Sequence, residues 1–147
     1  MFKTLVLTLL LCLLIMPAVV KAEGSIVQEY CEQVTEGSYE FIRIVFSVVN
    51  FNLPEPVCDL HFTPEPYPAI PGCEILECYA PAGWSCALAP GGGADYWADT
   101  PNDCVPPGTY LNGFELILQT PDWCCYVTEF TGPAGDVMLQ QEECFLC

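Results

Sequence analysis

Residues 39–52 have the sequence YEFIRIVFSVVNFN, the longest patterned segment of the chain. Apolar residues occupy both alternating faces of the segment, and β-branched and aromatic types dominate. A surface helix would show a polar stripe with a period of about 3.6 residues, which is missing here. The segment therefore predicts a strand that is at least partly covered on both faces.

The two faces of this predicted strand differ in composition. The first face has an unbroken apolar run in the middle of the segment, namely Ile42, Ile44, Phe46 and Val48. The second face mixes apolar and polar residues, namely Phe41, Arg43, Val45, Ser47, Val49 and Phe51. We expect the first face to join the main core. We expect the second to be half-buried or free for a partner through Phe41, Val45 and Val49.

Shorter segments along the rest of the chain share the strand composition. They cover residues 26–34, 57–62, 74–79, 84–89, 95–98, 114–119, 123–130 and 136–145. Proline and glycine clusters separate them about every ten residues, which leaves no room for long helices. The pattern predicts an all-β fold, a disulfide-rich immunoglobulin-like β-sandwich of about seven to nine antiparallel strands.

The beginning of the chain has the features of a secretory signal peptide. Lys3 supplies a positive start, residues 5–20 are apolar, and Ala22 is a small residue at a cleavage position. The apolar run is shorter than the roughly 18 to 20 residues that span a bilayer, so we expect no membrane insertion after cleavage. The prediction is a signal peptide over residues 1–22 and a single domain over residues 23–147. That domain would be secreted or extracellular, at the cell surface or in the periplasm.

Cysteines give the most informative count. Of the 11 cysteines, Cys12 lies in the predicted signal peptide. The others are Cys31, Cys58, Cys73, Cys78, Cys86, Cys104, Cys124, Cys125, Cys144 and Cys147. An even number in an exported chain predicts disulfide bonds rather than zinc or thiol redox sites, and spacing leaves the pairing open.

The neighbours Cys124 and Cys125 point to opposite faces of a strand, so they should have different partners. Trp123 and Val127 share a face with Cys125. We therefore expect Cys125 to face the core and Cys124 the other side.

Charge limits the classes of partner. The chain has 19 acidic residues and three lysines or arginines, a formal net charge of −16. Cleavage of the signal peptide would remove Lys3 and Lys21 and leave Arg43 as the only strong base. Nucleic-acid binding requires clustered basic side chains, so DNA and RNA are excluded as expected partners, and anionic membranes are poor ones.

Catalysis is also disfavoured. His61 is the only histidine, and no lysine remains after cleavage, so nucleophilic and acid–base chemistry lack their usual groups. His61 and Asp59 alternate on one strand face, which a surface pair explains. We expect that the protein is not an enzyme and has no cofactor.

Two small-ligand hypotheses stay open. Asp95, Asp99 and Asp103 follow a triple-glycine turn and could bind calcium, which takes carboxylate oxygens from flexible loops. Carbohydrate binding would use flat aromatic faces, for which the candidates are Trp84, Tyr96, Trp97 and Trp123. For both groups a structural role, in a solvated loop or in the core, is the simpler explanation.

Short motifs between residues 80 and 130 carry a family resemblance. They are Gly83-Trp84-Ser85-Cys86, Tyr96-Trp97, Pro106-Pro107-Gly108 and Leu111-Asn112-Gly113-Phe114. The pattern resembles uncharacterised exported bacterial proteins with immunoglobulin-like sandwiches. The resemblance implies a bacterial surface or secreted context and brings no catalytic residues.

These observations predict a secreted, non-enzymatic structural or protein-binding module of the cell surface or extracellular medium, with self-association as one form of that binding. A carbohydrate or cell-wall binding module is the first alternative. A calcium-dependent adhesion module is the second.

Overall fold

The computed structural model describes residues 24–119 and 123–147. The predicted signal peptide lies outside the described residues. The described chain forms nine strands and one short helix: β1 (Gly24–Glu36), β2 (Tyr39–Asn50), β3 (Asp59–Glu65), β4 (Ile75–Tyr79), β5 (Trp84–Ala89), β6 (Gly93–Ala98), η1 (Pro101–Asp103), β7 (Thr109–Leu118), β8 (Trp123–Thr131) and β9 (Val137–Leu146). None of the described helical structure is long and apolar enough to cross a membrane.

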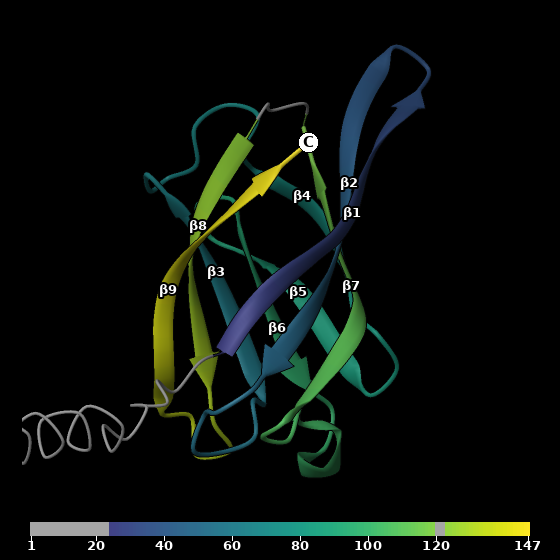
Figure 1. Ribbon diagram of the computed structural model, residues 1–147. Helices are drawn as coiled ribbons and strands as arrows, with labels where there is room; N and C mark the ends of the chain where they lie inside the picture. The colour runs from purple at the N-terminus through teal and green to yellow at the C-terminus, as the bar shows by residue number, and fades with distance from the viewer. Residues whose placement is uncertain (1–23, 120–122) are drawn as a thin grey trace, which may run out of the picture.

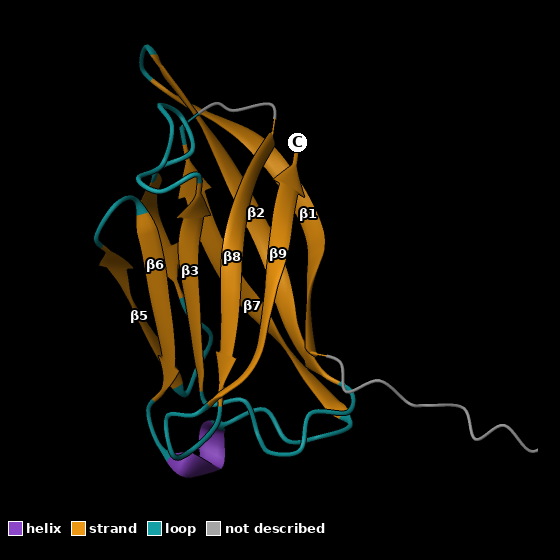
Figure 2. Cartoon of the chain, turned by 90° about the vertical axis from the view of Figure 1, so that its left-hand side faces the viewer, coloured by secondary structure: helices purple, strands orange, loops and turns teal. Residues whose placement is uncertain are grey.

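The strands form two antiparallel sheets packed face to face (Figures 1 and 2). One sheet has the order β1-β2-β7-β4 and the other has the order β5-β6-β3-β8-β9. Figure 2 shows the five-stranded sheet across the front, with the four-stranded sheet behind it. The predicted disulfide-rich β-sandwich is confirmed.

The spatial order of the strands is that of a variable-type immunoglobulin sandwich, with A-B-E-D in one sheet and C″-C′-C-F-G in the other. The chain fills these places in a different sequence. β4, at the D position, precedes β5 and β6, at the C″ and C′ positions. The fold is therefore immunoglobulin-like in layout with a rearranged middle section.

All nine predicted strands are present, and the largest difference in bounds is at β7. We expected this strand to begin near Phe114, but it begins at Thr109. Asn112 and Gly113 form a β-bulge within it, opposite Ser47 of β2. Gly113 has a φ of +92°, a backbone conformation that glycine adopts without strain.

The core lies between the sheets and is centred on β2. Its first face is buried, as predicted: Ile42, Ile44, Phe46 and Val48 all belong to the core. The Phe46 ring lies 5.4 to 5.9 Å from four other rings, those of Phe62, Tyr96, Phe114 and Phe145. Such aromatic contacts add packing energy beyond the buried area.

The prediction for the second face of β2 was partly wrong. Val45 and Val49 are buried, because β2 is a central strand and the larger side chains of Tyr30 and Tyr110 flank them in register. Phe41 is half-buried. Val45 and Val49 therefore offer little surface for self-association.

Five disulfides pair all ten cysteines of the described residues. Cys31–Cys147 and Cys78–Cys86 connect edge strands of opposite sheets, one at each side of the sandwich. The remaining bridges are Cys58–Cys104, Cys73–Cys124 and Cys125–Cys144. The predicted disulfide bonding is confirmed, and such bridges are typical of an oxidising compartment.

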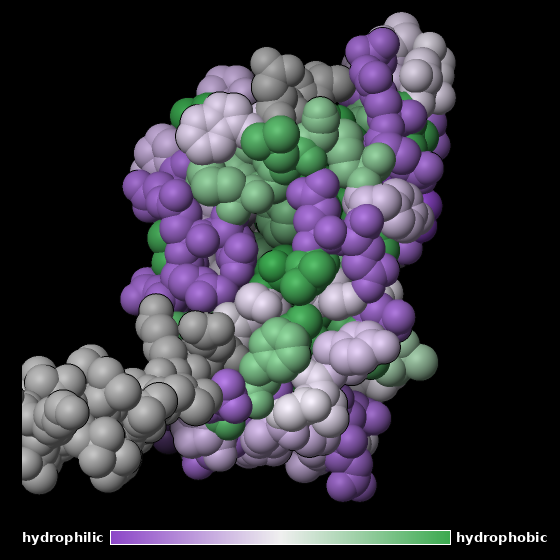
Figure 3. Space-filling view, in the orientation of Figure 1, coloured by the Kyte–Doolittle hydropathy of each residue, from purple (hydrophilic) through white to green (hydrophobic). Residues whose placement is uncertain are grey.

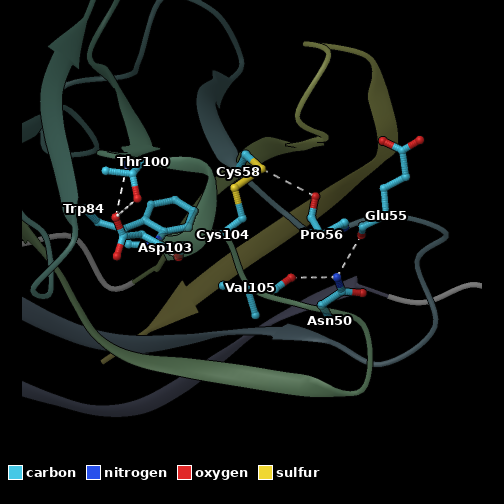
Figure 4. The surroundings of a disulfide bond; sticks show 9 residues. All are labelled: Asn50, Glu55, Pro56, Cys58, Trp84, Thr100, Asp103, Cys104 and Val105. Atoms are coloured by element: carbon cyan, nitrogen blue, oxygen red, sulfur yellow. Dashed lines mark hydrogen bonds between the residues drawn. A yellow bond between two sulfur atoms is a disulfide. The ribbon is translucent and has the colours of Figure 1, made fainter.

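Cys58–Cys104 joins the segments that lead into β3 and β7 (Figure 4). Beside it, the buried Asn50 amide donates hydrogen bonds to the carbonyls of Glu55 and Val105 at 3.0 and 2.9 Å. The bridge and the amide together hold the loops at this end of the sandwich.

Cys124 and Cys125 have different partners, as predicted, but their faces are reversed. Cys124 lies in the core with Tyr126, whereas Cys125 pairs with Cys144 across neighbouring strands of one sheet. The error came from Trp123, which we expected in the core and which is 60% exposed. At the end of a strand, a large aromatic side chain need not face inward.

Candidate binding groove

The β1–β2 hairpin extends beyond its own sheet. The last pair between β2 and β7 is Ile42 with Leu118, but β1 and β2 stay paired up to Glu36 and Tyr39. Residues 34–41 therefore form a two-stranded ribbon, which we call the arm, and Figure 1 shows it projecting past the rest of the sandwich. Residues 35–40 are exposed, so the arm has surface available for a partner.

Two β-bulges bend the sheet midway along β2. On one side Glu29 is the extra residue of β1, and on the other the extra residue of β7 lies opposite Ser47. The hydroxyl of Ser47 donates a hydrogen bond to the Glu29 carboxylate. Bulges increase the local twist of a strand, and here they do so after β2 has left the arm and joined the sheet.

A groove of about 310 Å³ lies at the base of the arm, on the outer face of the four-stranded sheet. Every strand of that sheet contributes to it. Its apolar walls are Val34, Phe41, Leu76, Ile117 and the ring of Tyr79. Figure 3 shows another side of the molecule, where hydrophilic side chains cover much of the arm.

Arg43 lies in this groove and is held by two carboxylates. Its Nε and Nη2 donate to the two oxygens of Glu115 at 2.8 and 2.7 Å, and its Nη1 donates to Glu32 at 2.8 Å. The hydrogen bonds to Glu115, and then those to Glu32, raise the pKa of Arg43 above its ordinary value. All three nitrogens of the guanidinium are thus engaged within the protein.

Two further carboxylates line the groove, those of Glu36 from the arm and Glu77 from β4. The Tyr79 hydroxyl donates a hydrogen bond to Glu77, and this bond raises the pKa of Tyr79, with smaller contributions from the charges of Glu115 and Glu36. Within the described residues, neither Glu36 nor Glu77 has a basic partner. The groove therefore combines apolar walls with two uncompensated negative charges.

The three aspartates of the calcium hypothesis do not converge. Asp95 accepts a hydrogen bond from His61 at 3.0 Å, and Asp99 accepts one from the Ser85 hydroxyl at 2.6 Å. Asp103 accepts from the backbone and hydroxyl of Thr100, at 3.1 and 2.6 Å. Each carboxylate has its own protein partner, and the three do not form a group of neighbouring metal ligands among the described residues.

The triple-glycine turn beside these aspartates has a packing role. A side chain at Gly91 would lie 2.1 Å from the ring of Tyr67, and one at Gly93 would lie 2.2 Å from a backbone oxygen of β3. Glycine is needed here because neighbouring segments approach the backbone closely.

The partner of His61 differs from our expectation. We expected a pair with Asp59, which lies on the same strand as His61, but His61 pairs with Asp95 on the neighbouring strand β6.

The four aromatic residues of the carbohydrate hypothesis do not form one surface. Trp84 and Tyr96 are buried in the core. In the strand register, Trp97 lies opposite Asp59 of β3, and Asp59 lies opposite Thr131 at the end of β8. The exposed Trp123 is the first residue of β8, at the other end of that strand. At about 3.3 Å per residue, the two exposed indoles are roughly 26 Å apart along the strands.

One group of potential metal ligands occurs among the described residues, formed by Cys125, Glu142 and Cys144. Its two sulfur atoms are joined as a disulfide. Cysteine binds zinc as a thiolate, and bridged sulfur atoms are not thiolates, so this group fits a bridge and not a zinc centre.

Several groove residues were not among the sequence candidates, and Glu36, Leu76, Glu77, Tyr79 and Glu115 are the main ones. They come from three strands that are distant in sequence. The one usable signal was the presence of a single arginine, since Arg43 must find its partners among many acids.

No known family model matches the chain, and no curated protein matches it in sequence. Among solved structures, it is similar to an uncharacterised protein from Nocardia farcinica whose crystal structure reveals an immunoglobulin-like fold. The two chains are 16% identical, with a TM-score of 0.49, over 75% of this chain and 80% of that one.

Proposed function

We propose that the protein is an exported, non-enzymatic binding module that holds a partner protein with its arm and groove. The observation that carries this proposal is the groove of about 310 Å³ at the base of a hairpin that projects beyond its sheet. Apolar walls bordered by a few polar groups are typical of binding sites. Exposed aromatic residues add to this surface, since Tyr39 and Tyr79 are 66% and 50% exposed.

The proposal favours a different protein over a second copy of this chain. The arm carries Glu36 and Glu40, and the groove that it would meet carries the uncompensated carboxylate of Glu77. Bringing like charges together costs free energy, and the chain as a whole is strongly acidic. Self-association through this face is therefore disfavoured at neutral pH.

The proposed compartment is the cell surface, the periplasm or the extracellular medium. Five disulfides in a chain of 147 residues support it, because such bridges persist where the environment is oxidising. Bridges also make a binding module resistant to unfolding outside the cell.

Photo-crosslinking tests the proposal and identifies the partner. A photoreactive amino acid replaces Tyr39 on the arm in one variant and Val137 on the other sheet in a second variant. We expect a discrete adduct from position 39 and none from position 137, because only the arm would contact the partner. An adduct from position 137 alone would contradict the proposal.

The partner is then purified and titrated by calorimetry against two matched variants. Tyr79→Ala removes a wall of the groove, and Tyr110→Ala removes an even more exposed tyrosine from the same outer face at the opposite end of β7. We expect Tyr79→Ala to weaken binding about tenfold or more, as for a central interface tyrosine, and Tyr110→Ala to change it less than about twofold. Equal effects of the two variants would show that the groove is not the binding site.

A further inference from the structure

We infer that the groove recognises a basic, extended segment of its partner, and this inference rests on the proposed function. Arg43 is the only strong base of the predicted mature chain. Its guanidinium already satisfies Glu115 and Glu32 through three charged hydrogen bonds. An acidic ligand would have to displace one of these carboxylates, so anions are poor occupants.

Two further carboxylates of the groove, those of Glu36 and Glu77, are not engaged by Arg43. Glu36 lies on the arm wall and Glu77 lies on the β4 wall, so the groove presents negative charge on both sides. The hydrogen bond from Tyr79 fixes the Glu77 carboxylate in place. A lysine or arginine side chain between these walls would meet a charge partner at either side, and no described basic group competes for them.

Apolar surface lies beside those charges. Val34, Phe41 and the Tyr79 ring line the groove together with Glu36 and Glu77. Lysine and arginine pack their aliphatic stems on apolar surface while their charged ends reach polar groups. Arginine and lysine also stack on tyrosine faces. A basic side chain matches this mixture better than a purely apolar one does.

The shape of the site indicates that the segment is extended. The lining residues run across all four strands, from β1 in the arm to β4 at the opposite edge of the sheet. A chain that follows this line presents alternate side chains to the sheet, as a strand does. Alternating basic and apolar residues would then place one type over the carboxylates and the other over the apolar walls.

Fluorescence anisotropy with three labelled nonapeptides tests the inference. The peptides alternate valine with lysine, with glutamine or with glutamate, so that they differ in charge only. At low salt we expect saturable binding of the lysine peptide and much weaker binding of the other two. No saturable binding of the lysine peptide, or equally tight binding of the glutamine peptide, would overturn the inference.

Matched charge variants separate recognition by the groove from general attraction to an acidic protein. Glu36→Gln with Glu77→Gln removes two charges from the groove, and Glu65→Gln with Glu142→Gln removes two exposed charges from strands of the other sheet. We expect the first pair to weaken binding of the lysine peptide about fivefold to tenfold and the second to change it less than about twofold. Equal losses would overturn the inference.

Arg43→Gln gives an effect of opposite sign. It leaves the carboxylates of Glu32 and Glu115 without a partner and makes the groove more negative, so we expect tighter binding of the lysine peptide by a factor of about two to five. Weaker binding by a variant whose circular dichroism spectrum is unchanged would overturn the inference.

The Tyr79→Ala variant distinguishes failure of this inference from failure of the proposed function. The two peptides could bind the parent protein equally well, and Tyr79→Ala could weaken the binding of both to the same extent. In that case the groove binds peptides and only the charge preference is wrong. If binding of the lysine peptide is unchanged both in Tyr79→Ala and in the Glu36→Gln, Glu77→Gln double variant, then the groove is not the binding site and both proposals fail.

Discussion

The outer faces of the two sheets belong to one sandwich but differ in the geometry and exposure of their ion pairs. On the four-stranded sheet, Arg43 and Glu115 form a two-point ion pair beside apolar walls, and their side chains are 32% and 23% exposed. On the five-stranded sheet, His61 and Asp95 form a single-point pair, and their side chains are 39% and 40% exposed. The first pair is more sheltered and belongs to a groove, whereas the second lies on an open surface.

The surroundings of the two pairs extend this difference. His61 has Asp95 and Glu129 as its register partners on the neighbouring strands, so its row on the five-stranded sheet is acidic on both sides. In the groove, by contrast, acidic and apolar residues alternate around one neutralised arginine. The inward positions of both sheets form one core, so the outward positions of each sheet can differ in chemistry without changing the fold.

Phe46→Ala should have the largest effect, because Phe46 belongs to the core on which both outer faces depend. It is fully buried and contacts four rings. We expect a loss of about 3 to 5 kcal/mol in the free energy of unfolding, measured by urea denaturation. The control Phe51→Ala, at a residue 59% exposed, should cost less than about 0.5 kcal/mol. Similar losses for both would contradict the assignment of the core.

The disulfides at the two sides of the sandwich should contribute differently to the free energy of unfolding. Cys31–Cys147 joins residues separated by 116 positions and connects the arm-bearing strand to the other sheet, while Cys78–Cys86 spans 8 positions. A bridge that closes a longer loop restricts the unfolded chain more. We expect replacement of Cys31 and Cys147 by alanine to cost about 2 kcal/mol more than replacement of Cys78 and Cys86. Urea denaturation checks the difference, and an equal or reversed order would contradict it.

The pH dependence of stability should reflect two carboxyl groups whose pKa is raised by burial, Glu143 at the edge between the sheets and Asp59 on the five-stranded sheet. A raised pKa means that the folded state binds the proton more tightly than the unfolded state does. The stabilisation is complete below the ordinary carboxyl pKa and is lost as the pH rises through the folded pKa. We therefore expect the melting temperature to rise as the pH falls from about 7 toward about 5.

Glu143→Gln sharpens this prediction, because glutamine keeps an acceptor for the Ile26 backbone, which lies 3.3 Å from the Glu143 carboxylate. The variant should show a smaller rise in melting temperature than the parent over the same range. Thermal melts followed by near-ultraviolet circular dichroism measure both. A melting temperature that falls steadily as the pH is lowered would contradict the predicted direction of the pH dependence.

Calcium should have the smallest effect. Because Asp95, Asp99 and Asp103 each have a separate protein partner, we expect calcium and sodium chlorides at equal ionic strength to shift the melting temperature equally. Differential scanning fluorimetry measures the shifts. A further increase with calcium that disappears in Asp99→Asn would restore the calcium site and reduce the contrast between the two faces.

The sequence predicted the strands well because alternation and turn residues are local properties. The pattern of residues 39–52 alone located β2 and the face that fills the core. The sequence could not predict the groove, because Arg43 and Glu115 are 72 positions apart and meet only through the pairing of β2 with β7. The prediction that Trp123 faces the core was also wrong, since burial at the end of a strand depends on what packs over it and not on residue type.

The most direct test of the central claim is a map of the contacted face by nuclear magnetic resonance. The ¹⁵N-labelled protein is titrated with the partner, or with the lysine–valine peptide, and the backbone amide shifts are followed. We predict changes along the arm (residues 34–41) and β4, with none at His61, Trp97 and Glu129 of the five-stranded sheet. Changes centred on the five-stranded sheet, with the arm and β4 unaffected, would contradict the account.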